Sequence, residues 1–237
     1  MVIPPRPRAG RHGWGIGGTR GTRSHHALRP DRSPINNAGF GYIGLNEACT
    51  LADLQHQFDT NFFGVARMNR AVLPHMRRQG RGLVIYMSSG GGRTVSPYLG
   101  AYSASKFALE AFAESYRYQL YSLGIDTVIL QPGAHATPVA SNSLSPSEAD
   151  RGAGCGSVAA QIEQAVANFR AFFANAAPSP QSVVDAVSAV LAMPPGTRPL
   201  RIPIATSGIE EINHVCAEMQ MADGRAVGPR CAATTSP

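Results

Sequence analysis

Apolar residues between positions 35 and 205 follow two spacings, one typical of helices and one typical of buried strands. Residues 101–123 carry a helical stripe of mostly apolar side chains, and Gly124 follows as a stop. Short apolar runs at 83–88 and 126–131 are bounded by glycine or proline, as buried strands are. Since strands and helices alternate, the pattern predicts an α/β fold with a parallel sheet flanked by helices.

The rest of the pattern predicts the other elements. Residues 51–78 are expected to be helical, with Thr50 as the cap, Asp53 three residues later, and a break at 61–64. The apolar side of this helix is predicted to contain Phe58, Phe62, Val65, Met68, Val72 and Met76. Further helices are expected at 157–174 and 181–193. A strand end with a turn is expected at 35–44, a last strand at 200–205, and a mobile segment at 138–156.

The first 34 residues differ in composition from the rest of the chain. They contain seven Arg, six Gly, five Pro and one Asp, with few apolar residues. Such a segment cannot bury a core, so we predict that residues 1–34 are disordered. They also hold the whole net charge of +6, because the remaining residues carry 14 basic and 14 acidic side chains. A folded domain is therefore expected at 35–223, followed by a flexible tail at 224–237.

Composition also limits the functional classes open to this domain. Without net charge, it offers no basic surface typical of nucleic-acid binding. No apolar run approaches the ~18 residues of a membrane span. The cysteines show neither metal-ligand spacing nor a disulfide framework; they are Cys49, Cys155, Cys216 and Cys231. We therefore expect no nucleic acid, membrane or metal partner, and a cytoplasmic location.

The chain has one lysine, Lys106, against twenty arginines, and it stands four residues after Tyr102. On a helix this spacing places both side chains on one face, here the face predicted to point inward. An ammonium can exchange a proton, whereas a guanidinium stays charged. A phenol beside a cation becomes a better acid near neutral pH. The pair is a candidate for proton transfer, although a lysine whose stem merely lies along the core would show the same spacing.

Polar motifs at the ends of the predicted strands accompany this pair. Ser89 directly follows the run at 83–88, and Asn61 lies at the expected helix break. The other two motifs are Asn36-Asn37-Ala38-Gly39 and Pro132-Gly133-Ala134-His135-Ala136-Thr137. Each residue also has an ordinary explanation: Asn61 as a buried amide that kinks the helix, and Ser89 and His135 as loop residues.

In this order and spacing, the motifs resemble the short-chain dehydrogenase/reductase family, hydride-transfer enzymes with a Rossmann-type fold. The resemblance runs from about residue 35 to about residue 207 and implies a catalytic tetrad of Asn61, Ser89, Tyr102 and Lys106. In these roles, Tyr102 exchanges a proton with the carbonyl or alcohol oxygen, and Ser89 holds that oxygen. Lys106 lowers the pKa of Tyr102 and holds the nicotinamide ribose, while Asn61 positions a water that links Lys106 to solvent.

The resemblance also implies a nicotinamide cofactor, NAD or NADP, which supplies the hydride. The expected cofactor contacts are Asn37, Ala38, Gly39, Tyr102, Lys106, Pro132, Gly133, His135 (through its backbone) and Thr137. The choice between NAD and NADP depends on residues after a second strand that this sequence does not show.

Substrate and assembly follow from the same resemblance. In the family the region of 157–174 covers the substrate, and its Phe and Val content here favours an apolar or aromatic small-molecule carbonyl or alcohol over a sugar phosphate. Family members pair through two long helices, here 51–78 and 101–123. A homodimer or homotetramer is therefore expected.

One family element has no counterpart. The glycine-rich dinucleotide fingerprint belongs to a βαβ unit of ~30 residues, and residues 1–34 contain no such unit. The cluster Gly13-Trp14-Gly15-Ile16-Gly17-Gly18 has no apolar strand before it and no helical pattern after it. The Rossmann-like domain is thus expected to be N-terminally truncated. Besides an oxidoreductase, two alternatives stay open: an inactive relative that acts as a binding or oligomerisation module, and a domain with an unrelated binding function.

Overall fold

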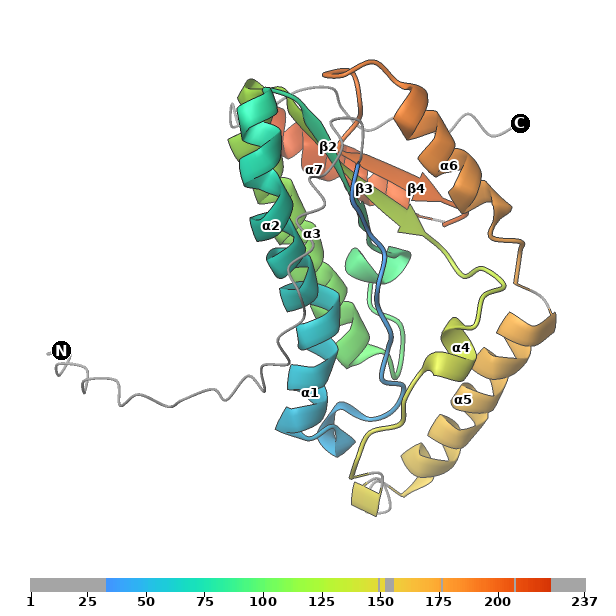
Figure 1. Cartoon of the computed structure of the whole chain (residues 1–237). Coiled ribbons are helices and arrows are strands. Elements are labelled where there is room, and N and C mark those ends of the chain that lie inside the picture. Colours follow the sequence, from blue (N-terminus) through green and yellow to red (C-terminus); the bar gives the residue numbers. More distant parts are fainter. Residues whose placement is uncertain (1–32, 149, 152–155, 176, 207, 223–237) are drawn as a thin grey trace, which may run out of the picture.

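A four-stranded parallel sheet in the order β1-β2-β3-β4 forms the centre of the molecule (Figure 1). The computed structural model describes residues 33–148, 150–151, 156–175, 177–206 and 208–222, so the expectations for residues 1–32 and for the tail lie outside the described residues. The strands are β1 (Ile35–Asn36), β2 (Gly82–Met87), β3 (Ile125–Pro132) and β4 (Arg201–Ile204). The predicted Rossmann-like α/β sheet is confirmed.

Alternating side chains of β2 and β3 build a core on each face of the sheet. Val84 and Tyr86 of β2, with Ile125 and Ile129 of β3, pack against helices on one face. The residues between them pack against a helix on the other face; they are Leu83, Ile85, Val128 and Leu130. Both strands are buried on both sides, which explains why apolar residues without a polar alternation dominate their central positions.

Two long helical segments cover the first face. They are α1 (Leu51–Phe58), which continues through the π-helical turn η2 (Asp59–Phe63) into α2 (Gly64–Gln79), and α3 (Gly100–Leu120). Thr50 and Asp53 form the predicted capping box at the start of α1. The helix break expected at 61–64 is the π-helical turn.

The inward face of α1 and α2 differs from the prediction at one apolar position. Met68 is 47% exposed, whereas Gln57, Asn61 and Asn69 are buried. Position 69 lies as close to the line of Val65 and Val72 as position 68 does. Asn69 takes the inward position because its amide group bonds to Asn36 and to the Tyr86 hydroxyl, a pairing that apolar spacing does not reveal.

Helix α3 ends as predicted, in a 3₁₀ turn, η4 (Tyr121–Leu123), followed by Gly124. Gly124 has φ of 72°, a left-handed conformation that glycine adopts without strain. Leu123, expected on the inward stripe, is instead 44% exposed, because the 3₁₀ turn no longer keeps the helical phase.

The C-terminal half contains two helices that the pattern did not predict: the short α4 (Val139–Asn142), within the segment expected to be mobile, and one long helix. Beyond α4, the expected helices are present as α5 (Ser157–Asn175) and α6 (Gln181–Ala192), the latter packed on the second face of the sheet. The long additional helix is α7 (Ile209–Ala222), which lies beside α3 and β4. Its inward residues include the polar Asn213, so it lacks a clear apolar stripe.

The segment expected to be mobile is fastened to the domain in its described part. Leu144 exchanges backbone hydrogen bonds with Gly41 and Ile43. Ser147 donates to Asp53 from its backbone nitrogen at 3.0 Å and from its hydroxyl at 2.6 Å. The chain between β3 and α5 is therefore tied to the loop after β1.

Two surface features complete the fold. β1 lies at one edge of the sheet, and no other strand of the described residues pairs with its outer side. Of the helices described, none is both long enough and apolar enough to cross a membrane.

Candidate active site

Helix α3 directs Tyr102 and Lys106 towards the carboxyl end of β2. Lys106 is only 4% exposed, and its Nζ donates to the Met87 carbonyl oxygen at 2.8 Å. Tyr102 is half-buried one turn earlier. The prediction that the only lysine points inward is confirmed, and its head group ends in the core rather than in solvent.

Two glycines flank the Tyr102 ring. A Cβ atom on Gly41 would lie 3.2 Å from Tyr102 Cδ2, and one on Gly91 would lie 3.2 Å from Tyr102 Cε1. The Ser89 hydroxyl accepts a hydrogen bond from the Gly91 backbone nitrogen at 3.1 Å, at the start of the 3₁₀ turn η3 (Gly90–Gly92). Ser89 and Tyr102 therefore meet at the carboxyl end of β2, and both are held in place by backbone that passes close to the ring.

The ionisation of the pair differs from the expectation. Burial raises the pKa of Tyr102, and a hydrogen bond with the Ser89 side chain lowers it by less. The Lys106 ammonium does not have the expected dominant effect, because it is bonded to Met87 and lies 5.7 Å from the centre of the phenol ring. Burial also lowers the pKa of Lys106 to about 8, while the negative charge of Glu110 opposes this shift.

Asn61 enters the site because the π-helical turn places it on the buried side. Its Oδ1 accepts from the Phe40 backbone nitrogen at 3.1 Å, and its Nδ2 donates to the Phe40 carbonyl at 2.9 Å and to Ser105 Oγ at 3.0 Å. A Cβ on Gly39 would lie 3.1 Å from Asn61 Oδ1 and 3.5 Å from Lys106 Nζ. The loop after β1 thus touches both Asn61 and Lys106.

The residues before Gly39 divide into one structural residue and an exposed pair. Asn36 is buried and donates to Asn69 Oδ1 at 3.4 Å, so it supports the sheet. Asn37 and Ala38 are exposed and line a pocket of about 320 Å³ beside η2 and α2. Of the predicted cofactor contacts in this motif, Asn37, Ala38 and Gly39 are open to a ligand.

The loop after β3 approaches the end of β4 very closely. The Gly133 backbone nitrogen donates to the Ile204 carbonyl at 2.8 Å, and a Cβ on Gly133 would lie 2.2 Å from the Ala205 carbonyl oxygen. Only glycine fits here, next to Pro132 at the end of the strand. Ala205 itself has φ of 51°, in the left-handed region that non-glycine residues seldom occupy.

The predicted contacts further along this loop have different surroundings. The His135 side chain is buried, and its ring nitrogens bond to the Gly133 carbonyl at 3.0 Å and to Ser182 Oγ at 2.9 Å. Its imidazole therefore joins the loop to the start of α6, which agrees with a backbone role alone. Thr137 is exposed, and its hydroxyl donates to the His135 carbonyl at 3.4 Å.

Thr206 joins the two sides of the site, and sequence reasoning missed it. A Cβ on Gly90 would lie 3.3 Å from Thr206 Cγ2, and one on Gly133 would lie 3.2 Å from the same atom. The Thr206 hydroxyl is buried and has no hydrogen-bond partner among the described residues. A buried unpaired hydroxyl between the Ser89 loop and the Gly133 loop provides an unused contact for a polar ligand.

A pocket of about 350 Å³ adjoins the start of α3. Its wall combines two loops and consists of Gly44, Leu45, Asn46, Val95, Ser96, Pro97, Tyr98 and Gly100. The Gly44 nitrogen donates to the Tyr98 carbonyl at 2.9 Å, and Tyr98 has φ of 63°. No motif in the sequence indicated this pocket, because two separate loops create it.

The fold and the site define a Rossmann-like α/β domain with a Ser–Tyr–Lys cluster at the carboxyl edge of its sheet. The family described as "short chain dehydrogenase" matches residues 34–148. Over these residues the chain is similar to the short-chain dehydrogenase/reductase family of oxidoreductases.

Individual relatives agree with this similarity. The chain is 42% identical over 111 residues to the uncharacterized oxidoreductase YusZ of Bacillus subtilis, covering 47% of this chain and 40% of YusZ. It is 44% identical over 108 residues to 3-ketodihydrosphingosine reductase of Bacteroides thetaiotaomicron, covering 46% of this chain and 40% of the reductase. The matched part thus spans well under half the length of these curated relatives.

The fold comparison covers more of the chain. The crystal structure of a short-chain dehydrogenase from Streptomyces avermitilis has a TM-score of 0.61 and 28% identity, covering 81% of this chain and 68% of that one. The structural similarity therefore extends beyond residues 34–148 into the C-terminal region.

Proposed function

We propose that this protein is an NAD(P)-dependent oxidoreductase that interconverts a carbonyl and an alcohol by hydride transfer. The observation that carries the proposal is the position of Lys106. Its ammonium is buried, bonded to Met87 and set beside Tyr102, which shares a hydrogen bond with Ser89. A chain that otherwise uses arginine has its one lysine at this point.

The described residues fit the nicotinamide end of such a cofactor. The unpaired Thr206 hydroxyl and exposed Thr137 offer hydrogen bonds to a carboxamide, and Lys106 has further donors for a ribose. Gly39 and Gly133 allow a ligand to approach the backbone closely. NAD or NADP would supply the hydride when bound.

The chain's own residues account for the proton and for the oxygen. Tyr102 carries its proton at neutral pH and is the candidate acid towards a carbonyl oxygen, although burial raises its pKa and so weakens it as an acid. Ser89 donates a second hydrogen bond to that oxygen and stabilises its developing charge. In reduction the carbonyl carbon gains hydride while its oxygen takes the Tyr102 proton; oxidation reverses both transfers.

The substrate in this proposal is an apolar carbonyl or alcohol. Leu45, Val95 and Pro97 give the pocket beside α3 an apolar wall. One relative is named a 3-ketodihydrosphingosine reductase, a name that specifies a lipid ketone. Both observations favour an apolar chain over a sugar phosphate.

An alternative function is that of a binding or oligomerisation module without turnover. The outer side of β1 has no partner strand among the described residues, and the match covers 40% of its curated relatives. These two observations favour a domain that depends on a further polypeptide segment for cofactor binding.

Calorimetric titration of the purified chain with NADH and NADPH separates the two functions. Binding at micromolar concentration of either nucleotide supports the oxidoreductase and justifies a panel of apolar carbonyl substrates. Absence of binding, from a sample shown by circular dichroism to be folded, contradicts the oxidoreductase and favours the module.

The catalytic assignment has its own test. Tyr102→Phe should abolish turnover with any substrate found, while nucleotide affinity stays near that of the wild type. Tyr118→Phe on the same helix is the matched control, since Tyr118 is 40% exposed and bonds to Glu114. Retained turnover in Tyr102→Phe would refute the assignment.

A further inference from the structure

Helix α3 continues the line of Tyr102 and Lys106 with two acidic residues. Glu110 and Glu114 follow Lys106 at successive intervals of four residues, so all four side chains lie along one side of the helix. Glu110 is 2% exposed, and Lys106 one turn away is 4% exposed. A buried carboxylate therefore neighbours the buried ammonium.

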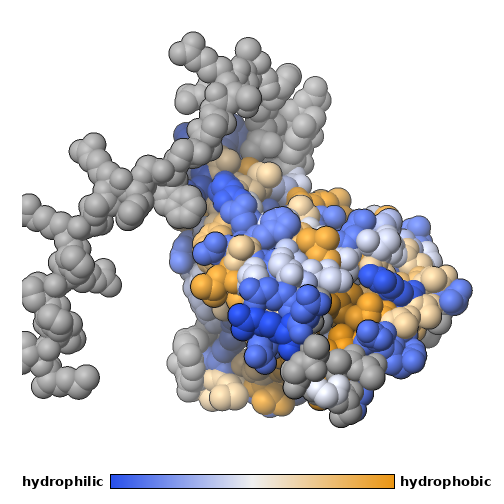
Figure 2. Space-filling view, turned by 90° about the horizontal axis from the view of Figure 1, so that it is seen from below, coloured by the Kyte–Doolittle hydropathy of each residue, from blue (hydrophilic) through white to orange (hydrophobic). Residues whose placement is uncertain are grey.

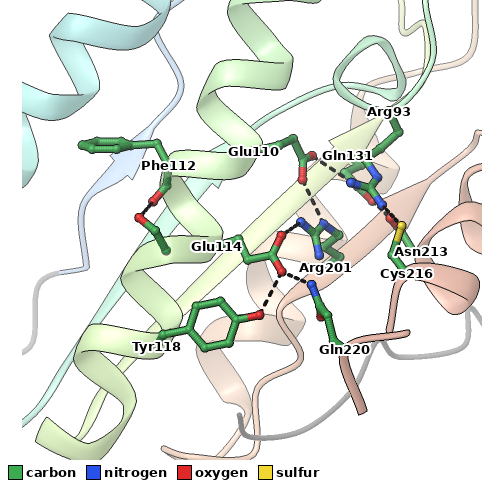
Figure 3. A network of polar contacts seen from close by, with 11 residues as sticks. Arg93, Glu110, Phe112, Glu114, Tyr118, Gln131, Arg201, Asn213, Cys216 and Gln220 are labelled. Atoms are coloured by element: carbon green, nitrogen blue, oxygen red, sulfur yellow. Dashed lines mark hydrogen bonds and ion pairs between the residues drawn. The ribbon is translucent and has the colours of Figure 1, made fainter. Parts of the chain in front are cut away.

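The Glu110 carboxylate is fixed by partners from two strands (Figure 3). Arg201 of β4 donates from Nε to Glu110 Oε2 at 2.9 Å and from Nη2 to Glu114 Oε2 at 2.6 Å. Gln131 of β3 donates to Glu110 Oε1 at 2.8 Å, and its own oxygen accepts from Asn213 of α7 at 2.7 Å. Because both carboxylate oxygens of Glu110 accept hydrogen bonds from buried partners, the Glu110 side chain is held in one orientation.

A protonated Lys106 adds a positive charge beside a cluster in which two carboxylates share one guanidinium. Glu110 and Glu114 supply two negative charges, whereas Arg201 supplies one positive charge. Uncompensated charge is costly in a buried site, so the cluster favours a second cation. Lys106 is the cation next to Glu110 on the same helix.

The other groups that contact Lys106 are uncharged, and a further cation nearby, Arg93, is paired with Cys216 rather than with Glu110 or Glu114. β2 offers Lys106 the Met87 carbonyl, and α3 offers the Tyr102 ring. η2 contributes Asn61, whose amide lies beside Gly39 near Lys106. The loop after β2 carries Arg93, which donates to Cys216 Sγ of α7 at 2.9 Å.

We propose that Glu110 is a positioning residue of this active site: held by Arg201 and Gln131, its carboxylate keeps the buried Lys106 ammonium charged beside Tyr102. The Asn213 contact makes α7 part of the same support. The consequence for catalysis rests on the proposed function, whereas the charge state of Lys106 does not. The opposing effects of burial and of the Glu110 charge on the pKa of Lys106 agree with this role.

The sequence allows a direct measurement of the Lys106 charge, because the chain has no other lysine. Protein grown with ¹³C-labelled lysine gives one side-chain ε-carbon signal, whose shift against pH reports the Lys106 titration. Glu110→Gln should move the midpoint to lower pH by about 1 unit, the usual effect of one nearby opposite charge. Glu114→Gln is the matched control: it also removes a partner of Arg201 but lies two turns from Lys106, so its midpoint should move much less.

Thermal melts show whether each variant is folded. If Glu110→Gln does not fold, Glu110→Asp carries the test, since it keeps the charge one methylene further away and should shift the midpoint in the same direction by less. An unchanged midpoint in the folded Glu110 variant, or equal shifts in the Glu110→Gln and Glu114→Gln variants, overturns the proposal.

Activity provides the second readout. If the wild type is active, the alkaline limb of kcat/KM against pH should move to lower pH in Glu110→Gln in step with the Lys106 titration, while a merely structural defect would lower the rate at every pH. A shifted titration in a protein without activity supports the role of Glu110 and contradicts the proposed function. Activity with an unshifted titration contradicts the role of Glu110 alone.

Discussion

At the scale of single residues, the site depends on glycines that admit the Tyr102 ring. Gly41 and Gly91 approach the ring from two loops, and each leaves less room than a methyl group needs. Because a small displacement of a catalytic group lowers the rate steeply, these contacts set the position of the phenol. The motifs around Ser89 and Tyr102 could be predicted from the sequence, but the loop packing that orients them could not, since it joins residues far apart in the chain.

Gly91→Ala should lower kcat/KM about tenfold or more, because the new Cβ lies 3.2 Å from Tyr102 Cε1 and forces the ring to move. Steady-state kinetics measures the loss. Gly64→Ala is the control, since its Cβ meets only the Asp59 carbonyl at an ordinary 3.4 Å. The idea fails if Gly91→Ala keeps the turnover of the control.

Thr206→Val should weaken nucleotide binding without reducing stability. Within the part of the chain that the structure describes, the Thr206 hydroxyl has no partner, so replacing it with a methyl group removes a buried unpaired polar atom. Thr127→Val removes a similar unpaired hydroxyl at the opposite end of β3 and serves as the control. Calorimetry should show weaker nucleotide binding only for Thr206→Val; equal affinities in both variants would count against a cofactor contact.

At the scale of elements, the segment from α1 to α2 shows both a success and a failure of sequence reasoning. The break at Asn61 could be expected, but a polar residue on the inward face could not be read from apolar spacing. Asn69 lies inward and Met68 outward, because the Asn69 amide group bonds to Asn36 and to the Tyr86 hydroxyl. Helix α7 was missed for a related reason: its contact with the sheet includes Asn213, which bonds to Gln131 instead of filling an apolar core.

Asp53→Asn should destabilise the fold at neutral pH by about 1–2 kcal/mol, because Asp53 completes the cap of α1 and ties Ser147 to it. Burial raises the pKa of Asp53, but hydrogen bonds from Ser147 and Thr50 outweigh it and hold the pKa well below its usual range.

The sign of the pH dependence follows from that depressed pKa. The stability that ionised Asp53 contributes is fully present above the unfolded pKa of ~3.9 and is lost as pH falls towards the folded pKa. The difference in unfolding free energy between wild type and Asp53→Asn, measured by urea unfolding, should therefore shrink progressively as pH falls from about 5 towards 1. Asp185→Asn, at an exposed position of α6, should have nearly the unfolding free energy of the wild type at every pH. If the difference in unfolding free energy between wild type and Asp53→Asn stays constant with pH, the role of the Asp53 charge is contradicted.

At the scale of the whole molecule, apolar side chains lie in several separate groups on the face seen from below in Figure 2. Others stand exposed on the two long helical segments, among them Phe63, Met68 and Phe107. These are the segments through which we expect a homodimer or homotetramer to form, as the family resemblance implies. Exposed aromatic residues on paired helices supply the area that such an interface buries.

Phe107→Arg should shift the protein towards the monomer, because a charge at a buried interface is costly. Light scattering coupled to gel filtration measures the change in mass. Val184→Arg places the same charge on α6 at a residue that is 53% exposed, and it should leave the mass unchanged. If the two variants have the same mass as the wild type, α3 does not form the interface.

The burial of Lys106 gives the chain an internal reporter of its own opening. An amine reagent reacts with neutral, accessible amines, and the only side-chain amine here is enclosed and bonded to Met87. Acylation of Lys106 therefore requires α3 to separate from β2, so its rate follows the free energy of that local opening. A ligand bound against Lys106 would slow the acylation in proportion to its occupancy. The extent of labelling of the one peptide that contains Lys106 therefore measures ligand binding, even when the reaction is unknown.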